Sequence, residues 1–435
     1  MKEPRLYRNP DRYRRAVREL ARVLEKTTPS GVSVGLADYA DEGLSPLRSS
    51  DLLTAAEHPE RNIYYPYFSA RLRLLFGETK PSVAGISLNY LSQALCAFSM
   101  AGFIRREFPG LRVIMGGGLV TSWTKMPGRM RPFTGLVDHF VTGPGEFQLL
   151  SLLGIDAGSE SMPCPEYATL PLDQYLSPGV VVPYSASTGC YWNRCGFCPE
   201  KAEENPYVPI PVPQTMADLA GLADRMRPSL IHILDNAVSP AHLNALSGES
   251  TGVPWYGFAR VNSQLADPGF CRQLKEAGCV MLKLGIESGD QEVLDRLEKG
   301  IDLETASAVL KNLKEAGIAA YVYLLFGTPA ETITAARKTL EFTVRHSSCI
   351  DFLNLAIFNM PVCSKSADTP NRRGFYEADL SLYTDFVHPQ GWDRKKVRLF
   401  LDREFRRHPA VAAILKKEPP AFTSNHAPFF IMNRS

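Results

Sequence analysis

The chain has 435 residues, more than one ordinary globular domain needs, so we expect two or three domains that each bury their own core. A composition of 45% hydrophobic and 22% charged residues is typical of a soluble folded protein. The 48 basic and 46 acidic residues leave a net charge of +2 with no long basic run, so the composition does not indicate a nucleic-acid partner.

The sequence also argues against a membrane protein and a disulfide scaffold. No stretch approaches the roughly 20 apolar residues that a membrane span needs. The first residues, Met1 to Pro4, do not resemble a signal peptide, so we expect a cytoplasmic protein without a membrane partner. Nine cysteines in a chain of this length are an odd and sparse set, which excludes complete disulfide pairing.

Residues 1–30 are predicted to form a helical arm, because apolar side chains recur at helical spacing between Pro10 and Lys26. Residues 31–158 change to short apolar runs that alternate with helical patterns such as Ser92 to Phe108. The predicted strands are Val32 to Leu36, Val83 to Leu88, Val113 to Gly116, and Phe140 to Val141. This alternation predicts a parallel sheet with helices on both faces, a Rossmann-like domain.

Residues 159–179 are rich in proline, serine and glycine and are predicted to form a linker. A second series of strands and helices follows over residues 180–361. Its predicted strands are Val180 to Ser187, Leu230 to Leu234, Trp255 to Ala259, Val280 to Ile286, Ala319 to Phe326, and Phe352 to Phe358. Six strand and helix units are too few for a closed eight-stranded barrel, so we predict a partial (β/α)6 barrel with its site at the carboxyl ends of the strands.

The remaining residues, 362–435, are predicted to form a small C-terminal cap with a charged helix from Asp393 to Arg407. Its tail, Pro419 to Phe430, places polar residues between aromatic ones. His426 in this tail is a candidate for contact with a substrate or for proton transfer. The alternative is that the tail is a packed plug.

Three cysteines, Cys190, Cys195 and Cys198, stand within one short segment directly after the first strand of the predicted barrel. Three thiolates hold three irons of a [4Fe-4S] cluster and leave the fourth iron without a protein ligand. A structural zinc site would need a fourth cysteine or histidine nearby, and none lies between Ala186 and Ala202.

Around these cysteines the sequence resembles the radical S-adenosylmethionine (SAM) superfamily, from Pro183 to about Pro361. The spacing departs from the usual family pattern, because four residues rather than three separate Cys190 from Cys195. Phe197 directly precedes the third cysteine and matches the family position that packs beside the adenine of SAM. The resemblance implies that the cysteines bind a [4Fe-4S] cluster and that SAM binds the open iron.

Further matches to the family fall at the ends of later strands. Arg260 matches the third-strand arginine, and Glu287 with Ser288 matches the fourth-strand acid and hydroxyl that meet the ribose. Asp235 stands where the family often has an acid that binds the methionyl amino group. The alternatives are helix capping by Glu287 or Asp235 and an ion pair between Arg260 and an acid such as Asp235.

The N-terminal domain resembles the cobalamin-binding domain of one radical SAM subfamily. Ser87 and the glycines Gly116, Gly117 and Gly118 follow predicted strands and are the candidate cobalamin contacts. None of the eight histidines fits the Asp-x-His-x-x-Gly motif that supplies an axial ligand. Two alternatives follow: cobalamin binds without a histidine ligand, or the domain has lost the cofactor.

These resemblances imply an enzyme that reductively cleaves SAM and modifies a small-molecule substrate, with an electron donor such as flavodoxin or ferredoxin. Cobalamin-assisted methyl transfer is the predicted reaction. The alternatives are a cobalamin-independent rearrangement, sulfur insertion or transfer of another SAM fragment, and a non-catalytic sensor of SAM or cobalamin. A tRNA-modifying enzyme would need a basic RNA-binding appendage, which the sequence lacks.

Overall fold

A computed structural model describes residues 1–156, 162–364, 372–373 and 378–433. Residues 159–161 of the predicted linker therefore lie outside the described residues. The chain divides into two compact units, each made of segments distant in the sequence. Unit 1 comprises Met1–Glu19, Ser161–Asn359 and Val387–Ser435, and unit 2 comprises Leu20–Glu160 and Met360–Phe386. No helix in the described part of the chain is long and apolar enough to cross a membrane.

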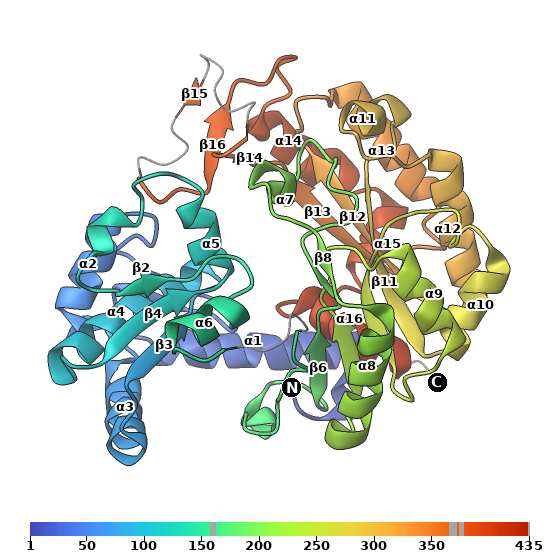
Figure 1. The fold of residues 1–435 in the computed structure, drawn as a ribbon. Helices are drawn as coiled ribbons and strands as arrows, with labels where there is room; N and C mark the ends of the chain where they lie inside the picture. Colours follow the sequence, from blue (N-terminus) through green and yellow to red (C-terminus); the bar gives the residue numbers. More distant parts are fainter. Residues whose placement is uncertain (157–161, 365–371, 374–377, 434–435) are drawn as a thin grey trace. The chain divides into compact units, whose positions relative to one another are not determined.

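Unit 1 is built on a six-stranded sheet in which every neighbouring pair of strands is parallel (Figure 1). Its strands are β6 (Val181–Tyr184), β9 (Leu230–Ile233), β10 (Trp255–Ala259), β11 (Cys279–Glu287), β12 (Ala319–Phe326) and β13 (Phe352–Ile357). They pair in chain order, with β6 and β13 at opposite ends, so the sheet is an open, partial barrel as predicted.

Helices connect these strands. They are α8 (Val212–Met226), α9 (Pro240–Gly248), α10 (Pro268–Glu276), α11 (Gln291–Arg296), α12 (Leu303–Ala316) and α13 (Ile333–Arg345). Aspartates and a threonine cap several of them, for example Asp302, whose side chain accepts the Thr305 N–H at the start of α12.

The two faces of the six-stranded sheet differ in chemistry. On β11, Leu282, Leu284 and Ile286 join the hydrophobic core beneath the helices. Because successive side chains of a strand alternate between faces, Lys283 and Gly285 point to the opposite side. We call this opposite side the inner face. It carries ring and amino groups that contact one another, from His232, Tyr256, Phe258, Lys283, Tyr321 and Tyr323.

The C-terminal segment of unit 1 contains α14 (Arg394–Phe400), which continues into a π-helical turn at Leu401–Phe405, and then α15 (Pro409–Leu415) and α16 (Thr423–Met432). The predicted charged helix from Asp393 to Arg407 corresponds to α14 and this turn. Helix α16 packs against β11. The Tyr256 hydroxyl donates to Asn425 Oδ1 at 3.3 Å, so the segment before and within α16 covers part of the inner face.

Unit 2 contains a parallel sheet of three strands, β3 (Val83–Ser87), β4 (Arg112–Gly116) and β5 (His139–Phe140). Its helices are α2 (Ser49–Glu57), α3 (Tyr65–Thr79), α4 (Leu91–Glu107), α5 (Gly118–Thr124) and α6 (Glu146–Leu152). Two short antiparallel sheets complete it, one of β1 (Val32–Val34) and β2 (Tyr39–Asp41), and one of β14 (Met360–Pro361), β15 (Arg372–Arg373) and β16 (Tyr383–Phe386). The predicted Rossmann-like parallel sheet is confirmed.

One predicted strand of that sheet is wrong. The run Val32 to Leu36 does not join β3 and β4, because its first three residues form a hairpin with β2. The connection is only four residues long, and the Gly35 N–H donates to the Asp38 carbonyl at 2.9 Å. A parallel partner would need a crossover of a dozen or more residues, so a short turn of this kind dictates antiparallel pairing.

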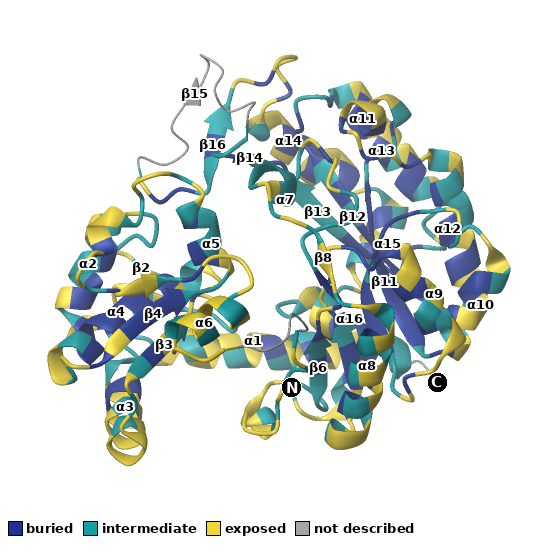
Figure 2. Ribbon diagram, viewed as in Figure 1, coloured by how far each residue is buried: buried dark blue, intermediate teal, exposed yellow. Residues whose placement is uncertain are grey.

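The buried residues lie mainly in the central strands and on the helix faces that pack against them. Most residues of β10, β11 and β12 are buried and dark blue in Figure 2, and the outward faces of the helices are yellow. In unit 2 the core includes Phe98, Trp123 and Phe133, which are fully buried. Helix α1 (Pro10–Thr27), predicted as an amphipathic arm, buries Tyr13 and Val17 and exposes most of its charged residues.

Candidate functional site

The three clustered cysteines lie in the loop between β7 (Ser187–Thr188) and β8 (Val208–Pro209), which pair as a short antiparallel ladder. This loop begins just after β6, at the carboxyl edge of the six-stranded sheet. Cys195 is buried, and Cys190 and Cys198 are half-buried. None of the three forms a disulfide.

The environment of these thiols suits a soft metal cluster. Burial raises the pKa of Cys198 to about 11, although backbone N–H groups of Glu200 and Lys201 point at its sulfur and act in the opposite direction. Burial also raises the pKa of Cys195, against the lowering influence of Lys299 and Arg260. Cys195 and Cys198 therefore retain their protons as free thiols, and metal binding must displace those protons. The nearby cations and N–H groups then stabilise the thiolates.

In the described part of the chain, no three His, Cys, Asp or Glu side chains converge closely enough to hold one metal ion. A cubane cluster does not need that convergence, because each thiolate binds a different iron. The three free thiols of this loop can therefore serve as the three protein ligands of a [4Fe-4S] cluster.

Lys299 connects the cysteine loop to the ends of the neighbouring strands. Its Nζ lies 2.9 Å from Glu287 Oε1 in a buried ion pair and 5.5 Å from the centroid of the Phe197 ring. The Lys299 carbonyl accepts a hydrogen bond from Arg260 Nη2, and Arg260 Nη1 lies 3.9 Å from Cys195 Sγ. The structure therefore brings together Phe197, Arg260 and Glu287, three of the residues predicted to contact SAM.

Trp192 contacts Arg260 and Glu298 at the same edge of the sheet. The Arg260 guanidinium lies 4.1 Å from the centroid of the Trp192 ring, and the indole N–H donates to the Glu298 carbonyl at 3.0 Å. Gly300 has φ +63°, and a Cβ there would lie 2.0 Å from the indole ring. Only glycine lets the chain pass so close to the indole, which explains the Lys299-Gly300 pair.

Asp235 and Ser288 have other partners. Asp235 is buried, and its carboxylate accepts the Ala186 N–H at 2.7 Å and the Ser187 hydroxyl at 2.6 Å. It thereby fixes the segment that leads into the cysteine loop. Ser288 is fully buried, and its hydroxyl accepts the Asp290 N–H at 3.1 Å. These contacts favour structural roles for both side chains over the predicted contacts with SAM.

The predicted cobalamin residues lie at the carboxyl edge of β3 and β4 in unit 2. Asn89 Oδ1 accepts the Gly118 N–H at 2.9 Å, and its amide donates to Ser87 Oγ at 3.1 Å. Gly117 has φ +105°, and a Cβ there would lie 2.6 Å from the Leu88 carbonyl oxygen, whereas a Cβ on Gly118 would meet nothing closer than 3.7 Å. The polypeptide itself therefore requires glycine at 117, and Gly118 is the glycine that leaves the edge open.

Gly116 is less permissive than Gly118, because a Cβ on it would lie 3.3 Å from the Val141 side chain. The two histidines whose residues fall in unit 2 are His58 and His139. His139 begins β5, at the amino end of that strand, and His58 ends α2. Neither belongs to the loops that follow the carboxyl ends of the strands, so a cobalamin bound at this edge would receive no histidine ligand from these loops.

His426 belongs to the packed plug. It is 5% exposed, and its Nδ1 lies 2.9 Å from the Tyr13 hydroxyl and 3.1 Å from the Tyr7 hydroxyl. Burial lowers the pKa of His426 to about 4. A neutral imidazole held between two tyrosines joins the N-terminal segment to α16, which favours the structural alternative.

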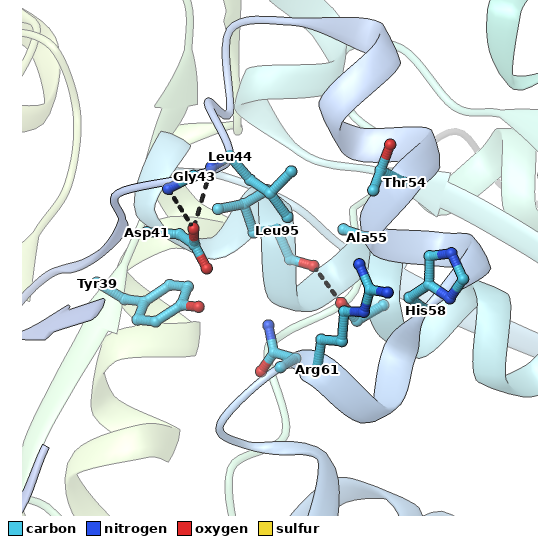
Figure 3. Close-up of a pocket in the computed structure, with 11 residues that line it drawn as sticks. Tyr39, Asp41, Gly43, Leu44, Thr54, Ala55, His58, Arg61 and Leu95 are labelled. Carbon is cyan, nitrogen blue, oxygen red and sulfur yellow. Dashed lines mark hydrogen bonds between the residues drawn. The ribbon is translucent and has the colours of Figure 1, made fainter. Parts of the chain in front are cut away.

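A separate cavity of about 300 Å³ lies within unit 2, between β2, α2, α4 and the turn after α2 (Figure 3). Its polar lining includes Asp41, His58 and Arg61. The Asp41 carboxylate already accepts the N–H groups of Gly43 at 2.8 Å and Leu44 at 3.0 Å. This cavity contains none of the predicted site residues.

Comparisons with known proteins agree with this geometry. Residues 184–343 match the family model of the radical SAM superfamily. An uncharacterized methyltransferase of Pyrococcus horikoshii, PH0819, is 24% identical over 310 residues, which are 62% of this chain and 65% of that protein. The matched part thus spans slightly less than two thirds of that relative.

Two solved proteins share the fold. One is TsrM from Kitasatospora setae, a radical SAM methyltransferase solved with its tryptophan substrate and a SAM analogue, at 17% identity and a TM-score of 0.60 over 85% of this chain and 86% of that chain. The other is OxsB, a cobalamin-dependent radical SAM enzyme with aqua-cobalamin and SAM bound, at 17% identity and a TM-score of 0.52 over 83% of this chain and 53% of that chain. These two structures confirm the predicted fold, and the match of residues 184–343 to the family model confirms the predicted family resemblance of that segment.

Proposed function

We propose that the chain is an enzyme that cleaves SAM reductively at a [4Fe-4S] cluster and methylates a small molecule with the help of cobalamin, because residues 184–343 match the radical SAM family model. The observation that carries this proposal is the junction of Cys195, Arg260, Lys299 and Glu287 at one edge of the open sheet.

A reduced [4Fe-4S] cluster supplies one electron for breaking a carbon–sulfur bond of SAM. The residues of the chain position that chemistry. Cys190, Cys195 and Cys198 are the proposed cluster ligands. We propose that Glu287 accepts hydrogen bonds from the ribose, that Arg260 pairs with the SAM carboxylate, and that Phe197 packs beside the adenine. Lys299 orients the Glu287 carboxylate, because their ion pair is largely shielded from water.

Cobalamin supplies a carrier for a methyl group. Three observations support its involvement: the TsrM and OxsB folds, the methyltransferase description of PH0819, and the open edge at Gly118. We propose that Ser87 and Gly116 to Gly118 form part of the cobalamin site. The substrate is proposed to be a small molecule, and the electron donor a small redox protein such as flavodoxin or ferredoxin.

A cobalamin-independent radical reaction is the second candidate. The observation that favours it is the internal explanation for Gly117, since this glycine is required by the Leu88 carbonyl whether or not a ligand is present. Rearrangement, sulfur insertion or transfer of another SAM fragment would then replace methyl transfer.

Cobalamin uptake distinguishes the two candidates. Anaerobically reconstituted protein should retain hydroxocobalamin at close to one equivalent, and Gly118→Leu should reduce that uptake at least fivefold. Gly110→Leu is the matched control, because a Cβ on Gly110 meets nothing within 4 Å and this residue precedes the amino end of β4. Failure of the wild-type protein to retain cobalamin would favour the cobalamin-independent reaction.

A further inference from the structure

Lys283 lies in the middle of β11, on the inner face of the six-stranded sheet, and only 8% of its surface is exposed. Its Nζ lies 2.9 Å from His232 Nε2 on β9. The same amino group lies 5.5 Å from the centroid of the Tyr256 ring and 5.3 Å from that of Phe258. His232 in turn stacks on Tyr256, with ring centroids 4.2 Å apart.

This lysine has no carboxylate partner within 4.0 Å among the residues that the structure describes. Two acids that face the same side are engaged elsewhere, Glu287 by Lys299 and Glu418 by the Tyr321 hydroxyl. A buried ammonium group normally requires a charged or strongly polar partner. Lys283 is therefore a buried cation without a counter-charge within 4.0 Å among the described residues.

The Lys283 ammonium has N–H groups that are available to a ligand. Burial lowers the pKa of His232 to about 3, so its imidazole is neutral, and a lysine ammonium can only donate. One N–H of Lys283 therefore goes to His232 Nε2, and two N–H groups are left for another acceptor. Burial lowers the pKa of Lys283 to about 8, which still leaves the ammonium as the main form near neutral pH.

The aromatic rings beside Lys283 indicate which type of ligand this site would bind. The rings of Phe258 and Tyr323 lie 4.7 Å apart on the same face, and both are partly exposed. They present flat apolar surface beside a single cation, which matches a planar apolar group that carries one negative charge.

The position also fits the reaction proposed above. A Cβ on Gly285 would point at Glu287 Oε1 and Lys299 Nζ, so Lys283 and the proposed SAM contacts share the inner face. Glu287 is four positions beyond Lys283 on β11, which corresponds to roughly 13 Å at about 3.3 Å per residue. A small molecule fixed at Lys283 would therefore extend toward the cysteine loop.

We propose that Lys283, held by His232, anchors a carboxylate of the substrate while Phe258 and Tyr323 pack against its planar apolar part. This assignment rests on the proposed function, because it treats the inner face as the substrate site. The anchor binds the carboxylate and forms no covalent bond.

The test compares binding of benzoate with that of benzamide, a neutral molecule of the same shape, to the anaerobically reconstituted full-length protein by calorimetry. Wild type should bind benzoate at least tenfold more tightly than benzamide. Lys283→Met should weaken benzoate binding at least tenfold and leave benzamide binding unchanged. Lys311→Met, at a mostly exposed lysine on α12, is the matched control and should bind both probes as wild type does.

Lys283→Gln provides a second variant of different packing, and retention of the cluster absorption and the thermal midpoint verifies that each variant is folded. Equal binding of the two probes by wild type, or unchanged benzoate affinity in both Lys283 variants, would overturn the proposal. Methyl transfer from SAM is measured separately on the same samples. Its absence, together with intact discrimination between the probes, would reject the proposed reaction and retain the anchor.

Discussion

At the residue scale, Lys299 accounts for the arrangement of the proposed SAM contacts. Its ammonium group pairs with Glu287, its carbonyl accepts from Arg260, and its side chain passes beside Phe197. Each of these three side chains comes from a different part of the chain. Their shared partner explains how they reach one edge of the sheet before any ligand binds.

The first prediction concerns Glu287. Glu287→Gln keeps the shape of the side chain and removes the charge that pairs with Lys299. Loss of a charged hydrogen bond of about 1–3 kcal/mol should weaken SAM binding by roughly 5- to 150-fold while the cluster remains in place. Equilibrium binding of SAM to the reconstituted protein measures this effect.

Glu315→Gln is the control for this prediction, because Glu315 is exposed on α12 and pairs only with Lys311 at 3.8 Å among the ion pairs of the described residues. Its affinity for SAM should equal that of wild type. Equal affinity in Glu287→Gln as well would show that Glu287 does not contact SAM.

The sequence identifies the individual candidate residues but not the contacts between them. Phe197, Arg260 and Glu287 could be selected because each follows a strand or the cysteine motif in the order typical of the family. The roles of Lys299 and Trp192 depend on a left-handed turn at Gly300, which brings distant segments together. The pairing of His232 with Lys283 was missed for a similar reason, since it requires the strand register across β9, β10 and β11.

At the element scale, the tail of the chain forms a buried contact with the N-terminal segment of the same unit. His426 on α16 meets Tyr7 and Tyr13, and burial keeps its imidazole neutral with a pKa of about 4. The unfolded chain binds a proton at this histidine near pH 6.5, so protons favour the unfolded state between these two values. Stability from this site is complete above pH 6.5 and is lost as the pH falls toward 4.

The second prediction follows from this difference in pKa. His426→Gln cannot titrate, so the stability advantage of wild type over this variant should shrink by roughly 3 kcal/mol between pH 7 and pH 4. Urea unfolding of the reconstituted proteins across this pH range measures the difference. An advantage that does not change with pH would mean that His426 titrates normally in the folded protein.

The third prediction concerns the turn after β4. Gly117→Ala should destabilise unit 2 by about 1–2 kcal/mol or more, because a left-handed φ is unfavourable for alanine and its Cβ would clash with the Leu88 carbonyl. Gly118→Ala should change stability little, since its Cβ has room. Thermal unfolding of the two variants tests this difference, and equal midpoints would contradict the tight packing at Gly117.

At the scale of the whole molecule, the order of elements was easier to predict than the pairing of the first strand. The six parallel strands of unit 1 are mostly apolar, because both faces of the sheet are covered or lined by large side chains. The short strand at Val32 has a similar composition, but the four-residue connection that follows it selects antiparallel pairing. Composition predicts a strand, whereas the length of the connection determines its partner.

The discontinuous make-up of the two units is a second feature that sequence could not provide. Residues 1–19 and 387–435 join unit 1, and residues 360–386 join unit 2. The contacts responsible are specific ones, such as the Trp123 indole N–H that donates to the Leu380 carbonyl at 3.0 Å within unit 2. None of these three segments has a local sequence pattern that indicates which unit it joins.

The proposed function requires the three-cysteine loop to hold the cluster that cleaves SAM. Its most direct test is anaerobic reconstitution with iron, sulfide, a reductant, cobalamin and SAM that carries a deuterated methyl group, followed by mass analysis of the SAM-derived products. A variant with Cys190, Cys195 and Cys198 all replaced by alanine is compared with a control in which the scattered Cys96 and Cys349 are replaced. We expect wild type and the control to contain the cluster and to consume SAM. The triple variant should contain no cluster and should not consume SAM. A full [4Fe-4S] complement and undiminished SAM cleavage in the triple variant would contradict it.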